Sequence, residues 1–461
     1  MAFHVRHPIA LAARPGARTF SVLYFVESLS RAAMATVLPL TAYALYETKE
    51  AVSLVYTAVS LAALCLSFAI PLLVRRISRK WTYTLGCALL VLCGALTWLE
   101  TPPSLALALL ARTLGAAVIN VTLNLYIMDN IGKRDLARSE TLRFAVSTLA
   151  WTAMPLIGVW LMQTRGLWAP CLVCIGGALL LAALFWYRRL AEGGPIRAAG
   201  GGAAPGRSPF RAIRRFAAQP RLRLAWSIAF ARSAFWTTFF VYAPILMVEG
   251  GRSATAGAMV VAGGNVMLLN NLFTRSWAAR FSLRRVIGGA LLVAAALVLL
   301  AALLTLAAPA PAGIVLVAAA FFVAMLDGLG PVPFLRAVRA RERAEMSTVY
   351  RTYLDASELL PQVAYFFLFM IGGFAAAFAG LAALMAAIGL LALRYSRQEI
   401  GANENARMFH VPVPSPSILI SPRPRAPSPI DPWRSGRAGP AGGRRASAPS
   451  RAVPSRSSTS G

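Results

Sequence analysis

The chain has 461 residues, of which 58% are hydrophobic and 14% are charged. Its mean hydropathy of +0.63 excludes an ordinary soluble domain and indicates that most of the chain is buried in lipid or protein. The formal net charge is +29, but the arginines lie mainly in short segments between apolar runs. That arrangement argues against nucleic-acid binding and is typical of loops in membrane proteins.

The first apolar run, near residues 20–46, follows the basic residues Arg6, Arg14 and Arg18. It is longer than the hydrophobic part of a signal peptide, which spans about 7–15 residues, and it contains Glu27 and Arg31. We therefore predict a retained transmembrane helix. An acid or a base that faces lipid costs about 2.5–3.5 kcal/mol, so both side chains need a protein partner or a function.

A helix needs about 20 mainly apolar residues to span a bilayer. The sequence contains twelve such runs, which predict an all-α membrane protein with twelve transmembrane helices. The runs lie near residues 20–46, 51–74, 82–99, 104–130, 141–163, 167–187, 222–248, 254–279, 286–307, 313–335, 353–375 and 378–394.

Basic residues are concentrated in every second connector between these runs. The only basic residues in the alternate connectors are Lys49, Arg165 and Arg252, and the connector at 308–313 has no charged residue. Because basic loops remain cytoplasmic, we predict that both termini are cytoplasmic and that the protein spans the cell inner (plasma) membrane. The basic connectors contain Arg75, Arg76, Arg79 and Lys80; Lys133, Arg134 and Arg138; the segment 188–221; Arg280, Arg284 and Arg285; and Arg336, Arg339, Arg341 and Arg343.

Composition divides the chain into five parts. The segment 191–220 is rich in Gly, Pro and Ala, which predicts a flexible cytoplasmic linker. The tail 398–461 is rich in Pro, Ser, Gly and Arg, so we predict that it is disordered. It is either inert or attracted to anionic lipid head groups. The predicted parts are an N-terminal arm (1–19), a six-helix bundle (20–190), the linker (191–220), a second six-helix bundle (221–397) and the tail (398–461).

The two predicted bundles repeat each other in sequence. The motif "YFVES" with Pro39 in the first span matches "AFARS" with Pro244 in the seventh, at an offset of 205 residues. Arg79 matches Arg284 at the same offset. Several matches in one register indicate an internal duplication, which is a plan of membrane transporters. We therefore predict two pseudo-symmetric six-helix bundles.

Charged and amide side chains within the spans follow a period of three helices. Spans 1, 4, 7 and 10 contain them, whereas the interiors of spans 3, 6, 9 and 12 have no charged residue. Charges inside a membrane face the protein interior or water, so the polar spans should surround a central cavity. The candidate substrate- or proton-binding residues are Glu27, Arg31, Arg112, Asn120, Asn124, Arg232 and Asp327.

The segment 71–80, "PLLVRRISRK", resembles the signature G-x-L-a-D-r-x-G-r-k that lies between the second and third helices of the major facilitator superfamily. Leu73, Arg76, Arg79 and Lys80 match it, whereas Arg75 replaces its Asp. With the twelve spans and the internal repeat, about residues 18–397 are similar to that superfamily. The resemblance implies two bundles that rock about a central site lined by helices 1, 4, 7 and 10, and it implies a monomer.

Three intramembrane groups each have two interpretations. Glu27 and Arg31 share one helix face and form either a titratable proton site or a permanent ion pair. Arg232, the equivalent of Glu27 in the second bundle, either pairs with Glu27 across the bundles or binds an anion. Asp327 lies in "DGLGPVP", whose glycines and prolines predict an interrupted helix. It is either a substrate or proton site or a structural acid.

The remaining candidates also have alternative roles. Asn120 and Asn124 share a helix face, as packing contacts or as substrate contacts. Arg112 either binds an anion or pairs with an acid. Two acids near the predicted cytoplasmic end are expected to form ion pairs of a gate rather than to bind substrate. The predicted gate comprises Arg76, Arg79, Lys80, Asp355 and Glu358.

The motif content argues against an enzyme. The chain contains neither the phosphate-binding G-x-x-x-x-G-K-[ST] motif nor H-E-x-x-H, so we expect no ATP-driven transport in cis, no metal site, no cofactor and no catalytic residue. We predict a secondary active transporter of a small molecule, coupled to protons, that works by alternating access in the lipid bilayer. The alternative is a transporter-like scaffold or sensor without transport activity.

Overall fold

The computed structural model describes residues 17–67, 69–77, 79–130, 136–190, 209–338 and 342–395. The regular structure of these residues is helical throughout. The predicted tail, most of the N-terminal arm and the first part of the predicted linker lie outside the described residues.

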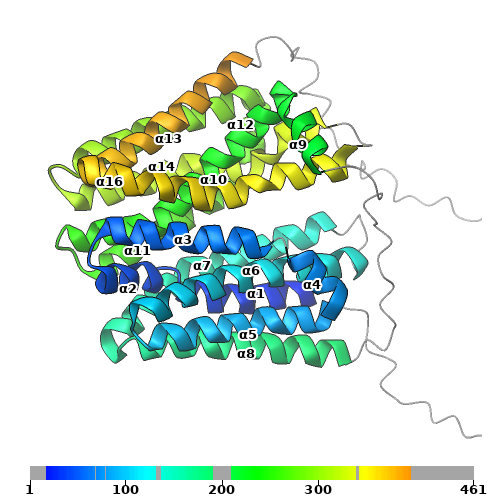
Figure 1. The fold of residues 1–461 in the computed structure, drawn as a ribbon. Helices are drawn as coiled ribbons and strands as arrows, with labels where there is room; N and C mark the ends of the chain where they lie inside the picture. Colours follow the sequence, from blue (N-terminus) through cyan, green and yellow to red (C-terminus); the bar gives the residue numbers. More distant parts are fainter. Residues whose placement is uncertain are drawn as a thin grey trace, which may run out of the picture. The chain divides into compact units, whose positions relative to one another are not determined.

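The N-terminal half comprises the described residues from 17 to 190, drawn blue to cyan-green in Figure 1. Its first two helices, α1 and α2, together form one apolar span, Thr19–Tyr46. The helices are α1 (Ala17–Ala33), α2 (Val37–Tyr46), α3 (Lys49–Ser67), α4 (Ile70–Ile77), α5 (Arg79–Trp98), α6 (Pro102–Asn130), α7 (Leu136–Arg165) and α8 (Trp168–Leu190).

The C-terminal half comprises the described residues from 209 to 395 and begins with a short helix inside the predicted linker. Its helices are α9 (Pro209–Ala217), α10 (Pro220–Glu249), α11 (Ala254–Met267), the 3₁₀ helix η2 (Leu268–Leu272), α12 (Thr274–Arg280), α13 (Leu283–Leu304), α14 (Pro309–Leu329), α15 (Pro331–Ala337) and α16 (Arg343–Tyr395).

Ten helical segments in the described part of the chain are long and apolar enough to cross a membrane. They cover eleven of the twelve predicted runs, because one of them contains two runs. The run 254–279 is divided among α11, η2 and α12, so no single helix there is long enough. The segment Met346–Arg394 has 49 residues, or about 74 Å of helix, more than twice the thickness of a bilayer core.

This long segment contains both of the last two predicted runs. Gly372 and Gly373 interrupt its helical backbone, and Gly373 has φ +56°, a conformation that favours glycine. In Figure 1 the chain reverses direction there, between the yellow and orange parts of α16. The two runs are therefore separate crossings joined by a tight turn.

Two helices of the N-terminal half approach each other closely at a glycine, which has no side chain. A Cβ atom on Gly158 of α7 would lie 2.1 Å from the carbonyl oxygen of Ala33 in α1. Small residues allow this kind of backbone contact between helices in a membrane. The contact anchors α1, which bears Glu27 and Arg31, against α7.

Contacts between the halves lie toward one end of the molecule. We call the end that contains the connectors 47–48, 99–101, 250–253 and 305–308 the turn end, and the opposite end, where α8 finishes and α9 begins, the linker end (Figure 1). The main helix pairs across the halves are α3 with α16, α7 with α11 and α2 with α10.

An ion pair closes the turn end. Lys49 Nζ lies 2.6 Å from Glu249 Oε1 and 5.4 Å from the ring centre of Phe374. Thr255 Oγ1 also donates to Gln163 Oε1 at 2.6 Å. The hydrogen bonds that join described residues of the two halves lie between this end and the middle of the molecule. The structure is thus closed at the turn end.

We expect Gly158→Ala to destabilise the protein, because its methyl group would overlap the backbone of Ala33; overpacking of this kind costs about 1–3 kcal/mol. Gly176→Ala is the matched control, since nothing lies within 4 Å of a Cβ atom there. Thermal unfolding in detergent checks the prediction: only Gly158→Ala should lower the melting temperature. Equal melting temperatures for the two variants would contradict the close helix contact.

Candidate substrate cavity and intramembrane charges

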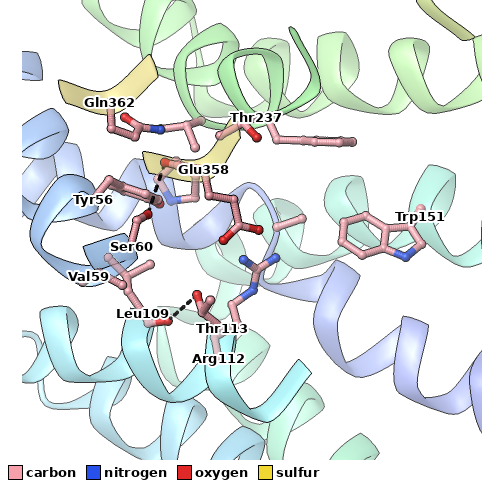
Figure 2. Close-up of a pocket in the computed structure, with 14 residues that line it drawn as sticks. Tyr56, Val59, Ser60, Leu109, Arg112, Thr113, Trp151, Thr237, Glu358 and Gln362 are labelled. Carbon is pink, nitrogen blue, oxygen red and sulfur yellow. Dashed lines mark hydrogen bonds between the residues drawn. The ribbon is translucent and has the colours of Figure 1, made fainter. Parts of the chain in front are cut away.

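A cavity of about 170 Å³ lies between the two halves. Its walls come from α2, α3, α6 and α7 of the N-terminal half and from α10 and α16 of the C-terminal half (Figure 2). Because a shared cavity changes shape whenever the halves move, its position makes it the candidate binding site.

Two opposite charges face each other in this cavity. Figure 2 shows the guanidinium of Arg112, from α6, and the carboxylate of Glu358, from α16, pointing toward one another. They do not form an ion pair, since the pairs among described residues join Glu27, Lys49, Arg215 and Arg232 to other partners. Arg112 Nε has no hydrogen-bond partner. Both charged groups are therefore open to a ligand.

Hydrogen bonds between α3 and α16 hold Glu358 in place. Ser60 Oγ donates to the backbone oxygen of Glu358 at 3.2 Å, and Ser53 Oγ donates to the backbone oxygen of Gln362 at 2.6 Å. The Gln362 side chain is buried and accepts from the Tyr242 hydroxyl, whereas its Nε2 has no hydrogen-bond partner. This second wall of the cavity thus also contains an unused donor.

Each half also contains an intramembrane ion pair of its own. Arg31 Nη1 lies 2.9 Å from Glu27 Oε1, and Glu27 is fully buried. Arg232 Nη1 lies 2.8 Å from Asp327 Oδ1, and both side chains are partly accessible. The structure therefore does not form the cross-half pair between Arg232 and Glu27 that was one sequence-based alternative. Local partners on α1 and α14 are nearer.

A row of aromatic rings connects these two ion pairs through the cavity wall. Arg31 lies over the ring of Trp151 at 5.8 Å, and the rings of Trp151 and Phe240 are 5.8 Å apart. Phe240 stacks on Trp236 at 5.6 Å, and Trp236 Nε1 donates to Asp327 Oδ2 at 3.1 Å. We call Trp151, Phe240 and Trp236 the aromatic bridge; the first two line the cavity.

The asparagines of α6 continue the polar wall toward the linker end. Thr113, Asn120 and Asn124 lie at helical spacing on one face of α6, and all three are half-buried. Neither asparagine side chain forms a hydrogen bond within the described part of the chain. The packing role considered for them thus has no hydrogen bond to support it, and both amides are available to a ligand.

The structure changes the interpretation of the predicted gate. Glu358 lines the cavity, so its position favours ligand contact over the gate role expected from the sequence. Asp355 is exposed one turn away. Lys80 Nζ lies over Trp186 of its own half at 6.0 Å. A gate formed by Arg76, Arg79, Lys80 and Asp355 remains a prediction.

Sequence reasoning missed the aromatic bridge and Gln362. For Trp236 a signal was present, since it follows Arg232 by four residues and thus shares its helix face. Trp151 and Phe240 lie in apolar runs that contain many other large side chains. Only the packing of α7 against the C-terminal half identifies them.

The family model of the Major Facilitator Superfamily matches residues 20–359. The chain belongs to the Major Facilitator Superfamily. The resemblance found in the sequence is thereby confirmed, and the chain is a multi-pass membrane transporter rather than an enzyme. No curated protein gave a significant match.

Solved transporter structures share the fold at low sequence identity. A transporter of the POT family in complex with a thioalcohol-conjugated peptide is 14% identical with a TM-score of 0.65, covering 82% of this chain and 95% of that chain. The nucleoside transporter NupG is 14% identical with a TM-score of 0.60, covering 82% of this chain and 99% of that chain. A variant of the E. coli fucose:proton symporter FucP is 15% identical with a TM-score of 0.54, covering 82% of this chain and 97% of that chain.

We expect Arg232→Met to destabilise this transporter by about 3 kcal/mol, because it leaves the largely buried Asp327 carboxylate without its cation. The double variant Arg232→Met/Asp327→Leu should recover much of this loss, since neither charge remains. Thermal unfolding of the single and double variants measures the coupling.

The matched control is the more exposed pair between Arg215 and Glu342, for which the same kind of cycle should give about 0–1 kcal/mol. Equal coupling energies for the two pairs would show that the bilayer interior does not strengthen the pair between Arg232 and Asp327.

Proposed function

We propose that this protein is a secondary active transporter that moves a small molecule across the cell inner (plasma) membrane by alternating access, driven by protons. The observation that carries the proposal is the charged cavity between two halves that are in contact toward the turn end. A transporter of this kind must expose one site to each side in turn.

The linker end is the cytoplasmic end in this proposal, because the basic connectors occur there. The polar contacts at the turn end accompany apolar packing, since α2 lies against α10 and the two halves share one hydrophobic core. Partly exposed ion pairs such as Lys49 with Glu249 contribute little net stability, so this pair can break and form again at low cost as the halves rock. With this orientation, contact at the turn end would close the cavity toward the outside.

Asp327 is the acid that we assign to proton coupling. It is partly accessible, whereas Glu27 is fully buried. The groups that face it are Arg232 and Trp236 of α10, with Tyr353 of α16 accepting a hydrogen bond from Arg232 at 3.3 Å. A buried acid that loses its cationic partner binds a proton more readily.

The aromatic bridge gives a ligand access to this acid. A ligand that displaces Phe240 in the cavity wall moves Trp236, which stacks on it and donates to Asp327. Substrate binding and protonation are thereby linked within the C-terminal half. The name of the fucose:proton symporter that shares this fold agrees with proton coupling.

The test uses the full chain in liposomes that contain a pH-sensitive dye. A thermal-shift screen of sugars, organic acids, amino acids, lipids and cationic drugs first selects a ligand, since a ligand of the folded state raises its apparent stability. The selected ligand should then drive proton movement across the membrane.

We expect Asp327→Asn to bind the ligand but to lose ligand-dependent proton movement, because an amide cannot carry the proton. Glu27→Gln is the comparison and should keep ligand-dependent proton movement, since Glu27 is fully buried. Loss of proton movement only in Glu27→Gln would overturn the assignment of Asp327. Ligand binding without any flux in the unmodified protein would support the scaffold or sensor alternative.

We expect Lys49→Met to open the turn end, because it removes both the ion pair with Glu249 and the contact with Phe374. Spin labels at residues 47 and 306, on a Cys65→Ser background, should report a longer average distance. Arg252→Met is the control, since it removes an exposed charge at the same end. Unchanged distances in Lys49→Met would mean that this ion pair does not hold the turn end closed.

A further inference from the structure

The charges in the cavity define what kind of molecule it accepts. Arg112 and Glu358 come from different halves of the transporter and face each other without forming an ion pair. Arg31, the other arginine next to the cavity wall, is already paired with Glu27. The cavity thus offers one cation and one anion that face each other but form no direct ion pair.

The hydrogen-bonding groups are divided in the same way. Donors for an anionic group are the guanidinium of Arg112 and the unpartnered Nε2 of buried Gln362. Glu358 supplies the only carboxylate of the lining, and carboxylates accept hydrogen bonds from ammonium groups. A ligand with both kinds of group can satisfy both walls.

Other ligand classes leave a charge without a partner. An anion alone would satisfy Arg112 but would repel Glu358, and a cation alone would do the reverse. A neutral sugar would form a direct ion pair with neither Arg112 nor Glu358, so it would not use the stronger hydrogen bonds that charged groups form with each other. A zwitterion is the one class that neutralises both charges at once.

The size and the walls of the cavity limit the body of the ligand. A cavity of about 150 Å³ is known to hold benzene, so one of about 170 Å³ accepts a body of similar size. Val59, Leu109 and Val241 provide apolar contacts, and Trp151 and Phe240 provide aromatic ones. These surfaces fit a short apolar chain better than a polar one.

We propose that the cavity binds a small zwitterion with an apolar body, of the size of an aliphatic amino acid, with its carboxylate at Arg112 and its ammonium at Glu358. The proposal deepens the proposed transport function and rests on it for the role of the cavity. A zwitterion also bridges α6 and α16, and so draws the two halves together across the cavity. A ligand with one charge cannot form this bridge.

The test compares valine with its two single-charge analogues, 3-methylbutanoate and 2-methylpropylamine, by calorimetric titration of the full-length protein in detergent. We expect valine to bind at least tenfold more tightly than either analogue. Weaker binding of valine than of either analogue, or no binding of valine, leucine or glycine to folded protein, would overturn the proposal.

Two variants assign the charges. Glu358→Gln should weaken valine binding at least tenfold and leave binding of 3-methylbutanoate unchanged or tighter, because that analogue has no ammonium. Arg112→Met should weaken valine binding equally and spare 2-methylpropylamine. Arg252→Met, with an exposed charge at the turn end, is the control and should change neither. The assignment would be wrong if Glu358→Gln weakened the binding of valine and 3-methylbutanoate equally. It would also be wrong if Arg112→Met weakened the binding of valine and 2-methylpropylamine equally.

The outcome separates the two proposals. If a sugar or a simple organic anion is transported and no zwitterion binds, the transport function stands and the zwitterion site is wrong. If valine binds with the expected pattern but is not carried across liposome membranes, the site stands and the transport function fails. Variant proteins are compared only when their melting temperature and elution volume match those of the unmodified protein.

Discussion

The cost of placing a charged side chain in a membrane governs this structure more than any other constraint. Lipid cannot solvate an ion, so each intramembrane charge needs a partner, a water-filled cavity or a ligand. Glu27 with Arg31 and Arg232 with Asp327 are satisfied within their own halves. Arg112 and Glu358 belong to neither of these ion pairs, and both line the cavity between the halves. Their position in the cavity is the reason why we take it as the candidate binding site.

The two halves combine similar sequence motifs with a local difference in how their charges are paired. Glu27 and Arg232 occupy equivalent positions in the sequence repeat, yet each forms an ion pair with a neighbour of opposite sign in its own half. A tryptophan accompanies both pairs, by a cation–π contact in one half and by a hydrogen bond in the other. Phe240 joins the two tryptophans at the cavity. Ring packing therefore connects the two ion pairs across the halves by way of the cavity wall.

The closed end combines polar contacts with apolar packing between the halves. Lys49 pairs there with Glu249, Thr255 donates to Gln163, and α2 packs against α10 within a hydrophobic core that both halves share. Within each half, by contrast, helices such as α1 and α7 approach until only a glycine fits. Close packing within each half favours movement of the halves as whole bodies.

The sequence by itself determined the membrane class, the positions of most spans and the intramembrane charges, because bilayer thickness and charge desolvation act on local composition. It did not determine partners, since helix spacing relates residues on one helix only. Tertiary structure decided that Arg232 pairs with Asp327 and not with Glu27, and that Glu358 lines the cavity. It also decided that Trp151 faces Phe240. Those contacts depend on how helices rotate and cross, which many residues set together.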